Sequence, residues 1–183
     1  MLVPEISLTP QTVDRFIARF GQDNIAVLHS KLSVGERYDQ WYKIKSGKAK
    51  IVIGARSAMF APVNNLGIII IDEEHDSSYK SEMSPRYNVK DVARYLGKKY
   101  DIPIVYGSAT PDMDTYYRAL KGDIELLELT KRANNSSLPN VEVVDLKQEL
   151  ANGNRSMISR KLYEAIEKNL QAKKQTILFL NRR

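Results

Sequence analysis

An acidic cluster follows the most apolar run of the sequence. Four isoleucines at positions 68–71 precede Asp72, Glu73, Glu74 and His75. Such β-branched runs are typical of buried parallel strands, and ligands of open α/β sheets bind at the carboxyl ends of the strands. Mg²⁺ prefers oxygen ligands and keeps several waters, so one or two carboxylates and a substrate phosphate can hold it. Asp72 would then bind the hydrated metal, and Glu73 would polarise a water for attack on a γ-phosphate.

The alternative for this cluster is an ordinary polar exit from a strand, which many sheets show. His75 by itself is more typical of a structural hydrogen bond than of a ligand. The second glutamate and the histidine favour the chemical interpretation of the cluster. In that interpretation His75 bonds to a second motif and relays the state of the nucleotide.

A second candidate motif, Gly-Ser-Ala-Thr-Pro at 107–111, follows an apolar run at 104–106. Small hydroxylated residues there allow close backbone approach and offer donors to a carboxylate or phosphate. The alternative is a helix start, since Thr110 and Pro111 match an N-cap followed by proline. Ser108 is not needed for that cap. An acidic cluster after one strand, followed about 35 residues later by a Ser-Ala-Thr segment after another, is therefore a more specific signal than either motif alone.

Alternating strands and helices are predicted around these two exits. Thr9 with Pro10 opens one helix that Gly21 ends, and Ser33 with Glu36 is a capping box that opens another. We expect strands at 2–3, 25–28, 51–53, 68–71 and 104–106, and helices over 10–20, 33–45, 89–96 and from 110 to Gly122. This pattern predicts an α/β fold, a parallel sheet with helices on both faces.

The alternation of apolar runs and helix patterns stops after Thr130, and the composition becomes polar. A polar stretch at 131–137 predicts a linker, and a second loop is expected at 151–154. A helix around 162–170 is expected to lead into a strand at 177–180. We expect a first domain at 1–130, a connecting segment at 131–157 and the start of a second lobe at 158–183. Because the chain opens and closes within expected strands, we expect it to be part of a larger enzyme.

Composition excludes several classes of protein. The 183 residues contain no cysteine and two histidines, which excludes disulfides, cysteine-bound zinc and thiol catalysis. No apolar run approaches the roughly 20 residues that span a bilayer, and the N-terminus does not match a secretory signal. A cytoplasmic protein without membrane contact is expected. The net charge is +6, and eight basic residues against two acidic ones lie between 155 and 183. This surplus favours an anionic partner, although a solvated basic helix explains it equally.

The motifs DEEH at 72–75 and GSAT at 107–110 resemble motifs II and III of superfamily 2 helicases. Within them, the chain is similar to the primosomal replication-restart helicases, from motif Ia into motif IV. The similar blocks are LVPEISLTPQ (2–11), VLHSKLSVGER (27–37), IVIGARSAMFAPVNNLGIIIIDEEHDSSYKSEMSPRY (51–87), VYGSATP (105–111) and ILFLNRR (177–183).

This resemblance implies a RecA-like fold and an ATP-dependent 3′–5′ DNA helicase that restarts stalled replication forks. It implies ATP and Mg²⁺ as ligands, single-stranded and forked DNA as partners, and contacts with primosome and single-strand-binding proteins. Zinc is expected only in a cysteine-bound module outside this sequence. No Gly-Lys-Thr phosphate loop occurs in the 183 residues, so we expect them to be inactive alone. The alternatives are another superfamily 2 DNA translocase and a non-hydrolytic nucleic-acid-binding fragment.

The resemblance also assigns site residues. Asp72 and Glu73 would serve the Mg²⁺ and the hydrolytic water, and His75 would act with Ser108, Ala109 and Thr110 in coupling the nucleotide site to DNA. The DNA path would include Pro4, Glu5, Thr9, Arg56, Ser57, Tyr79, Lys80, Arg86, Tyr87, Asn181 and Arg182. The alternatives are a structural ion pair for Arg56, half-packed tyrosines in a surface loop and solvated charge at the two terminal residues. Trp41 is expected to pack rather than to stack on bases.

Overall fold

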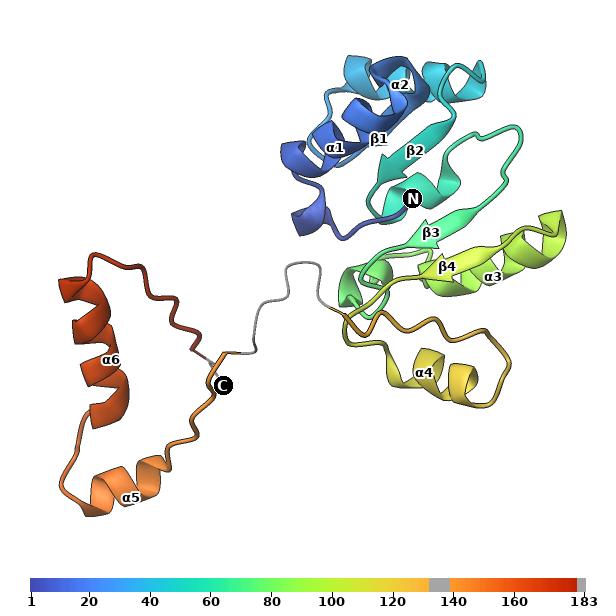
Figure 1. Cartoon of the computed structure of the whole chain (residues 1–183). Coiled ribbons are helices and arrows are strands. Elements are labelled where there is room, and N and C mark those ends of the chain that lie inside the picture. Colours follow the sequence, from blue (N-terminus) through green and yellow to red (C-terminus); the bar gives the residue numbers. More distant parts are fainter. Residues whose placement is uncertain (132–138, 181–183) are drawn as a thin grey trace. The chain divides into compact units, whose positions relative to one another are not determined.

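Four short parallel strands organise the first part of the chain (Figure 1). The computed structural model describes residues 1–131 and 139–180. β1 (Ile25–Leu28) pairs with β2 (Ile51–Gly54), and β3 (Ile69–Ile71) pairs with β4 (Ile104–Tyr106). All four lie within one residue of their expected positions. Ile68, expected as the first residue of its strand, is outside β3 and half-exposed.

The N-terminal residues connect the two pairs of strands. Leu2 forms parallel bridges with both Gly54 of β2 and Ile71 of β3. The amide of Leu2 donates to the carbonyl of Ile70 at 2.7 Å, and the amide of Val3 donates to the carbonyl of Gly54 at 3.0 Å. The order across the sheet is therefore β1, β2, residues 1–3, β3 and β4. This confirms the predicted strand stub at 2–3 and the parallel sheet.

Helices follow the strands along the chain. In the first part these are α1 (Pro10–Phe20), α2 (Val34–Lys45), α3 (Val89–Tyr100) and α4 (Met113–Leu120), with single 3₁₀ turns at η1 (Glu5–Ser7), η2 (Gln22–Asn24), η3 (Arg56–Phe60) and η4 (Ser77–Tyr79). The later part contains α5 (Leu146–Ala151) and α6 (Arg160–Gln171). α5 was not expected from the sequence.

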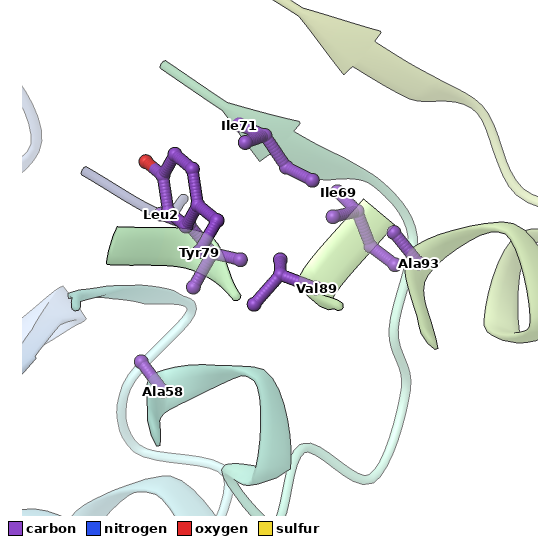
Figure 2. Packing of buried hydrophobic residues seen from close by; sticks show 7 residues of the cluster. All are labelled: Leu2, Ala58, Ile69, Ile71, Tyr79, Val89 and Ala93. Carbon is purple, nitrogen blue, oxygen red and sulfur yellow. The ribbon is translucent and has the colours of Figure 1, made fainter. Parts of the chain in front are cut away.

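Buried side chains cover both faces of the sheet. Successive strand residues point to opposite faces, so Leu2 and Val3 belong to different clusters. The largest cluster, drawn in Figure 2, consists of Leu2, Ala58, Ile69, Ile71, Tyr79, Val89 and Ala93. On the other face Val3, Ile25 and Ile53 pack against Phe16 and Ile17 of α1, and a third cluster of Ala26, Ile44 and Ala49 packs α2. Helices on both faces of a parallel sheet confirm the α/β, RecA-like prediction.

Local helix signals were correct where no tertiary contact competed with them. Thr9 caps α1 by accepting from the amide of Thr12, and Ser33 with Glu36 forms the predicted capping box of α2. The prediction that Thr110 caps the next helix was wrong, because α4 starts at Met113 and Asp112 occupies the N-cap. The amide of Asp112 donates to the carboxylate of Glu74 at 2.6 Å, so the residue at the start of α4 is tied to the acidic cluster.

The chain divides into two compact units, Met1–Leu127 and Glu128–Arg183. In the second unit Ser159 caps α6 by accepting from the amide of Leu162 at 3.1 Å. The prediction of a strand at 177–180 was wrong, since the structure describes no strand and no pairing partner at these positions. Asn181 and Arg182, expected on the DNA path, lie outside the described residues. None of the described helices is long and apolar enough to cross a bilayer.

Candidate active site

The sequence-predicted site residues of the first unit come from one edge of the sheet. Residues 4–9 follow the N-terminal strand stub, and η3 follows β2. The acidic cluster at 72–75 follows β3, and residues 107–110 follow β4. Because the strands are parallel, their carboxyl ends meet at this edge, where α/β sheets bind ligands (Figure 1).

The segments that follow β3 and β4 contact each other directly. The amide of Gly107 donates to the carbonyl of Ile71 at 2.8 Å, and the amide of Glu74 donates to the carbonyl of Gly107 at 3.0 Å. A Cβ atom at position 107 would lie 3.2 Å from Oδ1 of Asp72. Glycine therefore lets the second segment pass against the Asp72 carboxylate.

Glu73 has an unusual backbone. Its φ of 46° is in the left-handed region, which non-glycine residues seldom adopt. The amide of Glu73 donates to Oδ1 of the preceding Asp72 at 3.1 Å. Both carboxylates are partly exposed, so they are accessible from solvent at the edge of the sheet.

His75 links the two motifs. Nδ1 of His75 and Oγ of Ser108 form a hydrogen bond of 2.7 Å, and the amide of Thr110 donates to Oγ of Ser108 at 3.0 Å. Oε2 of Glu73 lies 3.6 Å from the same His75 nitrogen. The imidazole therefore stands between the carboxylate expected to orient water and the hydroxyl of the second motif. Ala109 and Thr110 are exposed beside it.

The donor set at this edge fits a hard divalent cation. Among the described residues no three His, Cys, Asp or Glu side chains gather as a self-sufficient metal site. Asp72 and Glu73 supply carboxylate oxygens side by side, and Mg²⁺ is commonly held by one or two carboxylates together with substrate phosphates. The site therefore suits a metal that arrives with a phosphorylated substrate.

Sequence reasoning assigned no role to a buried charged group behind these carboxylates. Glu74 is buried, and its carboxylate accepts from Nζ of Lys90 at 2.8 Å and from Oγ1 of Thr115 at 3.0 Å. Nζ of Lys90 also donates to Oδ2 of Asp112 at 2.7 Å. One signal was available: Lys90 falls on the face of α3 that Ala93 and Gly97 bury, where a lysine requires a carboxylate partner.

The hydrogen-bonded ion pairs around Lys90 shift the pKa values of Lys90 and Asp112. Burial disfavours the Lys90 ammonium, but hydrogen bonds to Asp112 and Glu74 outweigh it and raise the Lys90 pKa. The hydrogen bond from Lys90 lowers the pKa of Asp112. Both shifts favour the charged forms at neutral pH.

The loop after the acidic cluster corrects one expectation. Tyr79 was expected to offer a face for base stacking, but it is 1% exposed and belongs to the core cluster in Figure 2. Its hydroxyl donates to the carbonyl of Asp72 at 2.7 Å, and burial followed by the nearby carboxylates raises the pKa of this phenol. Tyr79 thus supports the backbone of the acidic cluster, and its face is not available to a base.

Arg56 attaches η3 to the same loop. Its guanidinium donates to the carbonyls of Ser78 and Lys80 and lies 5.9 Å from the ring centroid of Tyr87. The alternative of a structural ion pair for Arg56 does not apply, because its partners are carbonyls. Tyr87 is half-buried and also packs edge-on against Phe60, with centroids 5.1 Å apart. The structure thus joins the segments after β2 and β3.

The remaining residues of the expected DNA path differ in accessibility. Ser57, Lys80 and Arg86 are exposed, and Arg86 donates to the carbonyl of Glu82 at 3.3 Å. Glu5 is also exposed and accepts from the hydroxyl of Ser30.

Pro4 and Thr9 have structural positions in the segment that follows the strand stub. Pro4 is buried, so its side chain is not exposed for a direct contact with DNA in this structure. Thr9 uses its hydroxyl to cap α1. Both residues therefore have structural contacts within this segment.

Trp41 was expected to pack against other side chains, and the structure places it at a partly exposed position of α2. It is 38% exposed, its ring stacks beside Tyr38 with centroids 6.4 Å apart, and Nζ of Lys45 lies 4.6 Å from its centroid. Its contacts are therefore local to the helix, and the core cluster of α2 contains Ile44 instead.

Comparison with known proteins gives a consistent result. Residues 1–119 match the model of the family described as DEAD/DEAH box helicase. The chain is 54% identical over 183 residues to the replication restart protein PriA of Bacillus subtilis, covering 100% of this chain and 23% of that protein. The PriA proteins of Haemophilus influenzae and Synechocystis are 47% and 46% identical over 184 and 188 residues, and the match covers all of this chain and 24% and 22% of theirs. The chain thus spans about a quarter of the length of these relatives, and the expected resemblance is confirmed over its whole length.

Proposed function

Because this chain belongs to the DEAD/DEAH box helicase family, we propose that it supplies the hydrolytic carboxylates and part of the DNA path of an ATP-dependent DNA helicase. Its role would be replication restart, with 3′–5′ polarity, in the bacterial cytoplasm. One observation carries the proposal: Asp72 and Glu73, which follow β3, lie beside the segment that follows β4, and His75 forms a hydrogen bond with Ser108 of that segment. The similarity to replication restart proteins supports the biological role.

In this proposal the two carboxylates have different tasks. Asp72, held against Gly107, helps to hold a magnesium ion that arrives with ATP. That ion, when bound, neutralises charge on the β- and γ-phosphates. Glu73 projects from a left-handed backbone beside Asp72 and orients the water that attacks the γ-phosphate. The two roles require adjacent carboxylates with different orientations, which the turn at Glu73 provides.

We further propose that His75 and Ser108 transmit the state of the nucleotide site. A change at Glu73 can reach Ser108 through His75, because the imidazole is within 3.6 Å of one and 2.7 Å of the other. On the DNA side, the exposed Lys80 and Arg86 offer positive charge to phosphates. Arg56 fixes the backbone of this loop at Lys80, so DNA contact there is connected to η3.

The complete reaction needs groups outside these residues. The sequence contains no phosphate loop to hold the β- and γ-phosphates, so the 183 residues alone should hydrolyse ATP at no useful rate. Single-stranded and forked DNA would be the nucleic-acid partners, and primosome and single-strand-binding proteins the protein partners. The sequence has no cysteine that could hold zinc.

The test is ATP hydrolysis by the full-length gene product that contains this sequence, with Mg²⁺, with and without forked DNA. Glu73→Gln should lower DNA-stimulated kcat about 100- to 10,000-fold, the usual contribution of a positioned base, while DNA binding persists. Asp91→Asn is the matched control, because Asp91 pairs with Arg94 on the exposed side of α3. This variant should hydrolyse ATP at the wild-type rate. A wild-type protein that binds DNA without hydrolysing ATP would favour the non-hydrolytic alternative. An unchanged rate in Glu73→Gln would contradict the assignment of Glu73.

A further inference from the structure

A buried carboxylate joins four segments of the chain behind the proposed hydrolytic pair. Oε1 of Glu74 accepts from the amide of Asp112 at 2.6 Å, and Oε2 accepts from Lys90 at 2.8 Å and from Thr115 at 3.0 Å. The amide of Glu74 donates to the carbonyl of Gly107 at 3.0 Å. One residue thus connects the acidic cluster, the segment after β4, α3 and α4.

The chemistry of this group leaves little freedom for substitution. The side chain of Glu74 is 1% exposed and that of Lys90 is 11% exposed, so the buried carboxylate depends on Lys90 for charge compensation, while Lys90 also pairs with Asp112. Both carboxylate oxygens of Glu74 accept from donors, and an amide has only one acceptor oxygen. Glutamine would therefore place a donor against either the Asp112 amide or the Lys90 ammonium.

The location of Glu74 also bears on the residue before it. Glu73 has a φ of 46°, and a left-handed non-glycine residue persists only where its surroundings hold it. Asp72 on one side is held by the Tyr79 hydroxyl at 2.7 Å, and Glu74 on the other side is fixed by four hydrogen bonds. The backbone of Glu73 is thus clamped at both ends.

We propose that Glu74 and Lys90 form a positioning pair that holds Glu73 in its left-handed conformation and sets the spacing between the acidic cluster and the segment after β4. The kinetic part of this inference rests on the proposed function. Glu74 would touch neither nucleotide nor water, and would act only through Glu73 and the backbone at Gly107. Its loss would therefore slow the chemical step more than it weakens nucleotide binding.

The kinetic test uses the full-length gene product. Glu74→Gln should lower kcat for ATP about 10- to 100-fold, the cost of misplacing a reacting group by about 1 Å, and leave KM for ATP within about twofold. Lys90→Met should also lower kcat, because it leaves Glu74 buried without its cation. The double variant removes both the donor conflict and the uncompensated charge, so it should be less impaired than either single variant. Equal losses in kcat and in nucleotide affinity, or single effects that multiply in the double variant, would overturn the proposal.

A second measurement on the 183-residue chain needs no ATPase activity. In Glu74→Gln, amide hydrogen exchange should accelerate at position 74, whose amide donates to Gly107, and at Asp112, whose amide donates to the side chain at position 74. Exchange in β1 and β2 should stay unchanged. Asp91→Asn should change neither region. Acceleration throughout the chain, or none at Glu74 and Asp112, would overturn the positioning role. Local acceleration together with an inactive wild-type full-length protein would overturn the proposed function and leave the clamp on Glu73 supported.

Discussion

Replacing Gly107 by alanine tests whether the two motif segments must touch. The new Cβ would meet Oδ1 of Asp72 at 3.2 Å, closer than ordinary van der Waals contact, and the carbonyl of Ile71 at 3.8 Å. Gly107 is not among the glycines with a positive φ, so alanine fits its backbone without strain. The substitution therefore presses on the Asp72 carboxylate and on little else.

The expected size of the effect follows from this geometry. The carboxylate must move by about 0.2–0.4 Å, and a misplacement of about 1 Å costs about 100-fold in rate. On a logarithmic scale the shift corresponds to a loss of about three- to sixfold in kcat. Stability should change little, because the gain of about 0.4–1 kcal/mol from restricting the unfolded chain offsets the close contact.

Two assays separate these effects. ATP hydrolysis by the full-length gene product measures the first, and urea unfolding of the 183-residue chain measures the second. Gly35→Ala is the matched control: a Cβ there meets nothing within 4 Å, so it should stabilise α2 by up to about 1 kcal/mol without slowing hydrolysis. An unchanged kcat in Gly107→Ala would refute the claim that this contact positions Asp72. A loss of stability above about 2 kcal/mol would mean that the backbone cannot accept the methyl group.

Three further predictions concern the surroundings of the site. Tyr79→Phe should lower the free energy of unfolding by about 1 kcal/mol in urea titrations, because it removes the hydrogen bond to the carbonyl of Asp72. Asp112→Asn should lower stability by at most about 1 kcal/mol at pH 6. This difference should vanish as the pH falls below 3.8, because the hydrogen bond from Lys90 lowers the folded-state pKa of Asp112 from that ordinary value. Lys80→Ala should reduce the slope of log affinity for single-stranded DNA against log salt by about 0.7, as fluorescence anisotropy would measure.

Each of these predictions has an outcome that would contradict it. Tyr95→Phe, at an exposed position of α3, is the control for the loss of a phenol and should leave stability unchanged. If the Asp112→Asn difference stayed constant from pH 6 to pH 2.5, the ion pair with Lys90 would contribute nothing to folding. Lys98→Ala, near the end of α3 and away from the proposed DNA path, should keep the wild-type salt slope. An equal change in both lysine variants would point to net charge rather than a phosphate contact.

The sequence was sufficient for features that depend on neighbouring residues. The caps at Thr9 and Ser33 and the glycine that ends α1 were predictable, because each involves groups within a few positions of one another. The four strands were predictable from their β-branched runs. Thr110 shows the limit: its local sequence predicts an N-cap, but α4 begins at Met113, where the amide of the N-cap residue Asp112 donates to Glu74, 38 positions away. The apolar run at 177–180 shows another limit, because a strand needs a pairing partner that the structure does not describe there.

The candidate site divides in the same way. Asp72, Glu73, His75 and Ser108 were identified from their types and their position after apolar runs, because parallel strands bring such exits to one edge of a sheet. Only the tertiary structure showed that the face of Tyr79 is buried and that its hydroxyl supports the acidic cluster, since burial depends on residues far apart in the chain. The same holds for the Glu74–Lys90 pair. The buried face of α3 indicates that Lys90 needs a carboxylate partner, but only the structure identifies Glu74, in the turn after β3, as that partner.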